Sequence, residues 1–69
     1  MMNATIKAAA EVIAEVSPFL ASQFIAKPLH RRTVVNALFE KMKADGREDA
    51  YRVRVVLNRA LDAAQLVTN

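Results

Sequence analysis

Two prolines and a single glycine constrain the fold of this 69-residue chain most strongly, because these residue types interrupt helices. Ser17-Pro18 and Lys27-Pro28 each predict a break followed by a new helix, since the residue before proline avoids the α region and proline is tolerated at the first helical position. Gly46 suits the left-handed position that ends a helix. A β-sheet protein would need many more turn residues, so the sequence predicts an all-α fold.

The breaks predict a small four-helix, bundle-like domain. A kinked three-helix protein, with one helix running through Pro18, is the alternative. The length fits one domain spanning residues 1–69. The four expected helices are about Asn3 to Val16, Pro18 to about Ala26, a start between Pro28 and Thr33 to Ala44, and about Glu48 to Val67.

Polar side chains support these boundaries. Asn3 and Ser17 are suited to cap the first two helices by accepting from free backbone N–H groups. Glu48 and Asp49 would lie in the first turn of the last helix, where negative charge suits the helix dipole.

Apolar residues at helical spacing predict the core. The last two helices should meet through Val35, Leu38, Phe39, Val56, Leu57 and Leu61. The first helix has an apolar stripe of Ile6, Ala9, Val12, Ile13 and Val16. The second helix has large apolar side chains in nearly all directions, which predicts a helix that is buried all round. These side chains are Phe19, Leu20, Phe24 and Ile25.

A domain of this size is marginally stable and usually gains a disulfide, a metal or a partner chain. The chain has no cysteine and one histidine, His30, so we expect no disulfide, no metal site and no cofactor. Its most apolar region contains Glu11 and Glu15 and is broken by Pro18, so we expect no membrane span. The amino-terminal residues do not resemble a signal peptide, which makes the cytoplasm the expected compartment.

No pattern indicates catalysis. His30 has only Ser17 and Ser22 as hydroxyl partners, and Ser17 is expected to cap a helix. Nucleophilic catalysis needs a nucleophile, a base and a group that orients the base, and no such set is present. One glycine also cannot make a phosphate-binding loop. We therefore expect no catalytic residue and no small-molecule substrate.

Three apolar residues fall on the polar side of the last helix: Tyr51, Val55 and Leu66. In so small a domain they indicate a second buried surface, and a two-fold homodimer would bury it most simply. The competing interpretation is that the other helices wrap around this helix and bury both of its sides.

Positive charge is concentrated in the second part of the chain. Residues 1–26 have one lysine against two glutamates, and residues 27–69 have nine Lys and Arg against five Asp and Glu. A candidate basic contact surface consists of Lys27, Arg31, Arg32, Arg52 and Arg59. It could bind nucleic acid or an acidic protein. The competing interpretation is a solvated face whose arginine stems cover apolar surface and in which Arg59 lies near Asp62.

A helix-turn-helix fits poorly around Gly46, because positions that should be apolar hold Lys41, Asp45, Arg47 and Arg52. The sequence therefore predicts a small, non-enzymatic regulatory protein that binds a protein partner, with a homodimer expected. A nucleic-acid-binding regulator is the alternative. In composition the chain resembles accessory regulators of phages and other mobile elements, an analogy that implies no mechanism.

Overall fold

The computed structural model describes the backbone of residues 3–68 and the side chains of residues 3–65. In this part of the chain all regular structure is helical, which confirms the all-α prediction. The helix boundary at Ser17 also rules out the kinked three-helix alternative. The elements are α1 (Ala4–Val16), α2 (Pro18–Ala26), the 3₁₀ helix η1 (Pro28–His30), α3 (Arg31–Ala44) and α4 (Ala50–Thr68).

Both predicted amino-terminal caps are present. The Asn3 Oδ1 atom accepts a hydrogen bond from the Thr5 N–H at 2.7 Å. At the start of α2, the Ser17 Oγ atom accepts from the Leu20 N–H at 3.2 Å, and Pro18 occupies the first helical position. Each cap supplies a partner to an N–H group that a helix start leaves without one.

Gly46 ends α3 as predicted, with a φ of +77°. The Arg47 N–H donates to the Met42 carbonyl at 2.9 Å, and the Gly46 N–H donates to the Lys43 carbonyl at 3.0 Å. These two bonds form a Schellman motif, which requires one residue in the left-handed backbone conformation. Glycine adopts that conformation at little cost.

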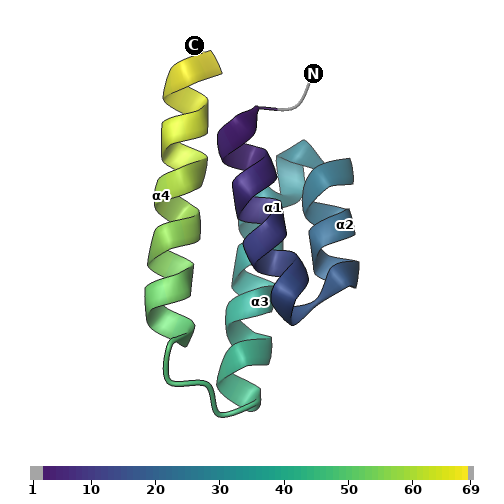
Figure 1. Ribbon diagram of the computed structural model, residues 1–69, viewed down its shortest axis with the longest axis vertical. Coiled ribbons are helices and arrows are strands. Elements are labelled where there is room, and N and C mark those ends of the chain that lie inside the picture. Colours follow the sequence, from purple (N-terminus) through teal and green to yellow (C-terminus); the bar gives the residue numbers. More distant parts are fainter. Residues whose placement is uncertain (1–2, 69) are drawn as a thin grey trace.

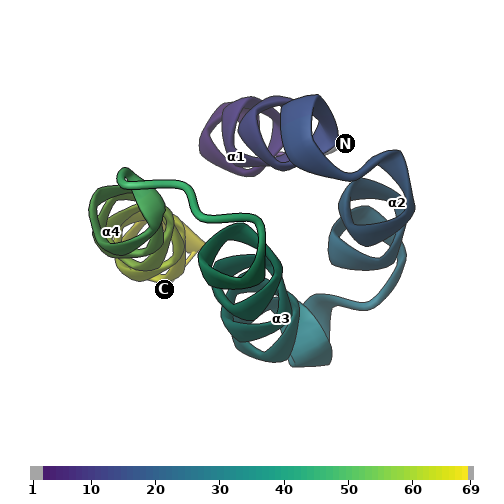
Figure 2. The ribbon, with the colours of Figure 1, turned by 90° about the horizontal axis from the view of Figure 1, so that it is seen from below.

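The four α-helices form a bundle in which α2 and α4 lie at opposite sides (Figures 1 and 2). Both α2 and α4 pack against α1 and α3, and they do not contact each other in the described part of the chain. Each of these outer helices therefore buries one side and leaves the other side uncovered.

The core draws on every α-helix. The largest fully buried side chains are Phe24, Ile13, Leu38, Met42, Leu57 and Val35. Of the six residues predicted to join the last two helices, Val35, Leu38, Phe39, Leu57 and Leu61 are buried. These five predictions are confirmed.

Val56 was predicted to be in the core and is instead 52% exposed. Successive residues of a helix are about 100° apart, so burying Leu57 in the gap between α1 and α3 turns Val56 out of that gap. Ala50, at the start of α4, is buried in the core instead.

The prediction that the second helix is buried all round is also wrong. Phe19 is 69% exposed and Ile25 is 44% exposed, because no helix covers the outer side of α2. On α1, Val12 is 37% exposed, and Ala10 is buried in its place.

The last helix begins at Ala50, two residues later than predicted. Glu48 and Asp49 therefore precede it. Arg47 holds the Asp49 carboxylate through two hydrogen bonds, from Nε at 3.1 Å and from Nη2 at 2.8 Å. These bonds lower the pKa of Asp49 below its ordinary value.

Truncation of Leu57 tests the junction of α3 and α4. Because Leu57 is 1% exposed, Leu57→Ala should lower the free energy of unfolding by about 2–5 kcal/mol in a urea titration. Val55→Ala is the matched control, since Val55 lies on the same helix and is 44% exposed; its effect should stay below about 0.5 kcal/mol. Equal losses in the two variants would contradict this packing.

Removal of the Ser17 hydroxyl tests the start of α2. Ser17→Ala should lower the free energy of unfolding by about 0.5–2 kcal/mol, because the Leu20 N–H loses its acceptor. Ser22→Ala makes the same chemical change at an exposed position inside α2, where alanine is the better helix former, and should be neutral or slightly stabilising. A Ser17 variant as stable as the Ser22 variant would show that the cap contributes nothing.

Candidate interaction site

Two of the three predicted dimer residues, Tyr51 and Val55, lie one turn apart on α4, and both are exposed. Tyr51 is 59% exposed, but its ring meets the Phe39 ring edge-on, with centroids 4.9 Å apart and planes at 70°. The Arg54 guanidinium lies over both rings, 4.1 Å from the Phe39 centroid and 5.4 Å from that of Tyr51. Tyr51 therefore helps to cover the junction of α3 and α4. Val55 is 44% exposed, and Leu66 lies outside the described side chains.

The structure divides the predicted basic surface into separate parts. Arg31 is half-buried, and its Nε atom donates to the Phe24 carbonyl at 2.9 Å. Its guanidinium also lies 5.4 Å from the centroid of the Phe24 ring. A cation that bonds a carbonyl in the last turn of α2 stabilises that helix end. Arg31 thus connects α2 to the start of α3.

Arg32 connects α3 to α4. Its Nη1 atom donates to Asn58 Oδ1 at 3.2 Å, and its Nη2 atom forms an ion pair with Asp62. The competing interpretation placed Arg59 near Asp62, but the ion pair of Asp62 is with Arg32, because α3 packs directly beside α4. Both partners are exposed, so the ion pair itself adds little stability.

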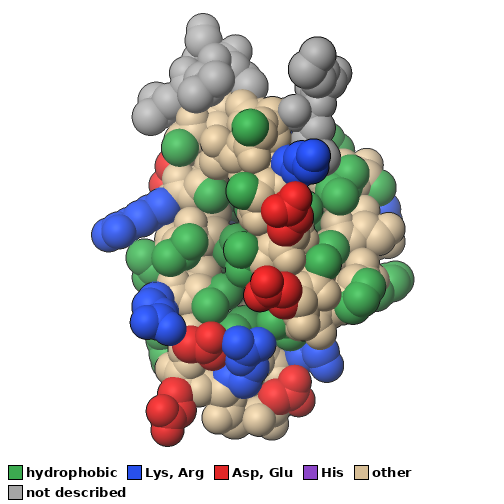
Figure 3. All heavy atoms as spheres, viewed as in Figure 1, with side chains coloured by type: hydrophobic (Ala, Val, Ile, Leu, Met, Phe, Trp, Pro, Cys, Tyr) green, Lys and Arg blue, Asp and Glu red, His purple; other side chains and the backbone are tan. Residues whose placement is uncertain are grey.

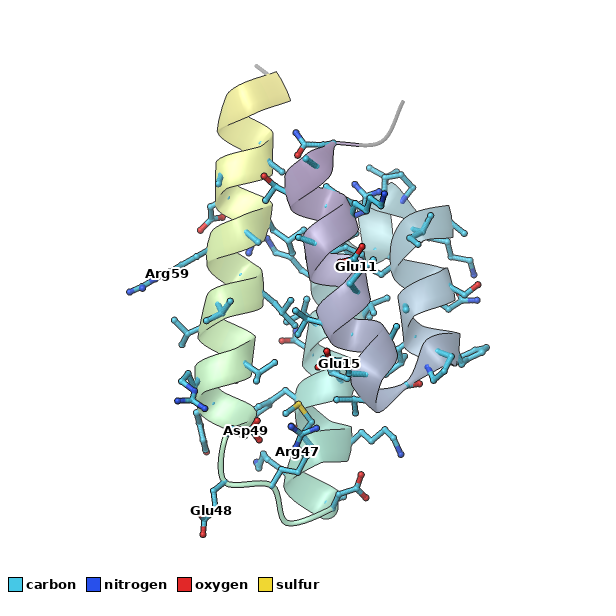
Figure 4. The ribbon with its side chains drawn as sticks, in the orientation of Figure 1. Glu11, Glu15, Arg47, Glu48, Asp49 and Arg59 are labelled. Carbon is cyan, nitrogen blue, oxygen red and sulfur yellow. The ribbon has the colours of Figure 1, made fainter. Side chains whose placement is uncertain are left out.

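The other three basic residues lie in two places. Lys27 lines an open groove of about 330 Å³ between α2 and α3, together with His30, Leu20 and Val34. Arg52 and Arg59 are exposed two turns apart on α4, and Arg59 points away from the bundle (Figure 4). The five predicted residues therefore do not share one binding surface.

Sequence reasoning missed an apolar stripe along the boundary of α1 and α4. Asn58 and Asp62 mark the flank of α4 that faces α3, because both contact Arg32. The helical period places Val56 and Ala63 on the opposite flank, beside α1. Both are exposed, and hydrophobic side chains run along this boundary in Figure 3.

On α1, the residues of the flank that faces α4 are Ala8 and Val12, which are also exposed. Glu11 and Glu15 project toward the viewer in Figure 4, and the right-handed turn of α1 then places Val12 on the flank beside α4. The stripe is thus Ala8 and Val12 from one helix and Val56 and Ala63 from the other. Nothing in the spacing of Val12 and Val56 separates them from core residues, so the sequence has no signal for this stripe.

Opposite charges flank the stripe. Glu11 and Glu15 lie on its α1 side and Arg59 lies on its α4 side (Figure 4). The helical period places Arg52 on the same side of α4 as Arg59. Within the part of the chain that the structure describes, none of these four side chains forms an ion pair. We call the stripe and its four flanking charges the α1–α4 face.

Comparisons of the chain with protein-family models, curated proteins and solved structures find no match. Among the described residues, no helix combines the length and apolar content needed to cross a membrane. No group of three or more His, Cys, Asp or Glu side chains in the same part of the chain is arranged to hold a metal ion. The exposed surfaces are therefore the features of this structure that bear on function.

Proposed function

We propose that this protein is a non-enzymatic regulator that acts in the cytoplasm by binding a protein partner through the α1–α4 face. The observation that carries the proposal is the exposure of Val12 and Val56, at 37% and 52%, on two neighbouring helices whose helical period turns both residues toward the α1–α4 boundary. Single exposed apolar residues are common on protein surfaces, but a continuous stripe along two helices is typical of an interaction site.

The chemistry of the face supports a protein partner. An apolar centre with a polar, charged rim is the usual organisation of a protein–protein interface. The face has both acidic and basic side chains, which suits a partner whose surface also has both. Binding would also stabilise a small domain that has no disulfide to support it.

Nucleic-acid binding remains the second candidate, and one observation favours it: Arg52 and Arg59 are exposed on the same side of α4. Two features count against it. Glu11 and Glu15 on the adjoining helix would repel phosphates, and Arg31 and Arg32 are already engaged in contacts within the chain.

Site-specific photocrosslinking tests the protein-partner proposal. The photoreactive residue p-benzoylphenylalanine is introduced at Val56, the protein is produced in its native cells, and adducts are analysed by mass after illumination. We expect a discrete protein adduct, because Val56 would lie in the centre of the interface. The matched control carries the same residue at Ser22, which is exposed on the far side of the bundle, on α2, and should give no such adduct.

A Val56 variant that yields no adduct, or the same adducts as the Ser22 variant, would refute the proposed site. An adduct that nuclease treatment removes would favour the second candidate instead.

Duplex binding tests the second candidate directly. If Arg52 and Arg59 contact phosphates, the double variant Arg52→Ala/Arg59→Ala should weaken binding and lower the salt slope by about two, as measured by fluorescence anisotropy. These two positions are chosen because they have no ion-pair partner among the described residues. No binding of the unmodified protein at about 50 mM salt would eliminate this candidate.

A further inference from the structure

We infer that the partner of the α1–α4 face is a second copy of this chain, related by a two-fold axis that runs parallel to α1 and α4 between the two protomers. In this arrangement α1 of each protomer lies over α4 of the other. The inference rests on the proposed function, and it replaces the predicted dimer surface of Tyr51, Val55 and Leu66 with a different one.

The face is self-complementary in charge. Its α1 side has Glu11 and Glu15 against a single cation, Lys7, and is therefore net acidic. Its α4 side is basic, with Arg59 and, by the helical period, Arg52. A two-fold axis along the boundary exchanges the two sides, so the glutamates of each protomer meet the arginines of the other. The two-fold axis therefore creates two equivalent contacts between opposite charges, one on each side of the interface.

The heights of these charged residues along α1 and α4 also fit the two-fold arrangement. Glu11 and Arg59 lie at a similar height in Figure 4, although they come from different helices. Rotation about an axis parallel to the helices preserves height, so Glu11 of one protomer comes opposite Arg59 of the other. Glu15 is one turn further along α1, and Arg52 is two turns from Arg59 in the same direction, because α1 and α4 run antiparallel. Glu15 and Arg52 then differ in height by about one helical turn, which the long arginine side chain can span.

The same rotation brings the apolar stripe onto itself. Val12 of one protomer then packs near Val56 of the other, between the two sets of ion pairs. Ala8 and Ala63 allow the facing helices to approach closely, because neither side chain extends beyond its Cβ atom. Charges at the rim set the orientation of such an interface, and the apolar centre supplies most of its affinity.

Pairing of α4 with α4 of a second copy is the competing arrangement. It would centre on Val55 and place Arg52 and Arg59 of both copies close together, with four like charges at one interface. Asp62 could offset only part of that charge, because it is already paired with Arg32. Electrostatic repulsion therefore favours the arrangement in which α1 of each copy lies over α4 of the other.

A charge exchange between two variants tests the geometry. The acidic side is reversed in Glu11→Arg/Glu15→Arg, and the basic side is reversed in Arg52→Glu/Arg59→Glu. Sedimentation equilibrium at micromolar concentration should give a dimer for the unmodified protein and a monomer for each variant alone. The dissociation constant of each variant's dimer should be about tenfold or more above that of the unmodified protein. Mixing the two variants should restore a dimer, because each reversed side then meets a reversed partner.

The matched control reverses two charges away from the face. Lys27→Glu/Lys41→Glu changes the net charge by the same amount as the reversal of Arg52 and Arg59, and its positions are exposed on other elements. This variant should remain a dimer. Circular dichroism should show unchanged helix content in all variants, since every substituted side chain is exposed.

Three results would overturn the inference: a monomeric unmodified protein, a failure of the mixture to restore the dimer, or an acidic-side variant that still dimerises. The last result would indicate pairing of α4 with α4. A monomeric protein that still gives a Val56 adduct with a different protein would refute the second copy and leave the proposed function standing. A monomer without any such adduct would refute both.

Discussion

The structure depends on the packing of a thin core to which every α-helix contributes. Phe24, Ile13 and Leu57 are fully buried from α2, α1 and α4, and α3 adds Val35, Leu38 and Met42. The rest of the buried set includes the small residues Ala9, Ala10, Ala21, Ala50 and Ala64, which let the helices approach closely. A core of this kind buries modest apolar area for each residue, so the fold has little stability to spare. The same arrangement leaves the outer sides of α2 and α4 uncovered.

Arginines connect the helices around this core. Arg31 joins α2 to α3 through the Phe24 carbonyl and ring, and Arg32 joins α3 to Asn58 and Asp62 of α4. Arg54 covers the rings of Phe39 and Tyr51 where α3 meets α4. These three arginines of the second part of the chain therefore support the fold. Arg52 and Arg59 on α4 are exposed, and Arg59 points away from the bundle in Figure 4.

The proposed binding surface combines an apolar stripe with separated charges of opposite sign. Neither helix presents this surface alone, because α1 supplies the acidic side and α4 supplies the basic side. Separation of charge across a boundary gives a surface that fits a rotated copy of itself, which a uniformly basic surface would not do. The proposed association would stabilise a protein with so small a core, since binding would add buried apolar area that the chain alone does not supply.

The sequence by itself determined the helices and their ends. Local hydrogen bonding decides these features, so Asn3, Ser17 and Gly46 could be assigned their roles before any packing was known. The sequence also determined which residues of α3 meet Leu57 and Leu61 of α4, because their spacing places them on one helix face.

The tertiary structure alone decided which of the remaining apolar residues are covered. Val12, Val56 and Phe19 have the same local pattern as core residues and are exposed, because their burial depends on where the neighbouring helices lie. The ion pair of Arg32 with Asp62 also depends on which helices are adjacent, and so does the placement of Glu11 and Glu15 across a shared boundary from Arg59. No local pattern encodes either feature.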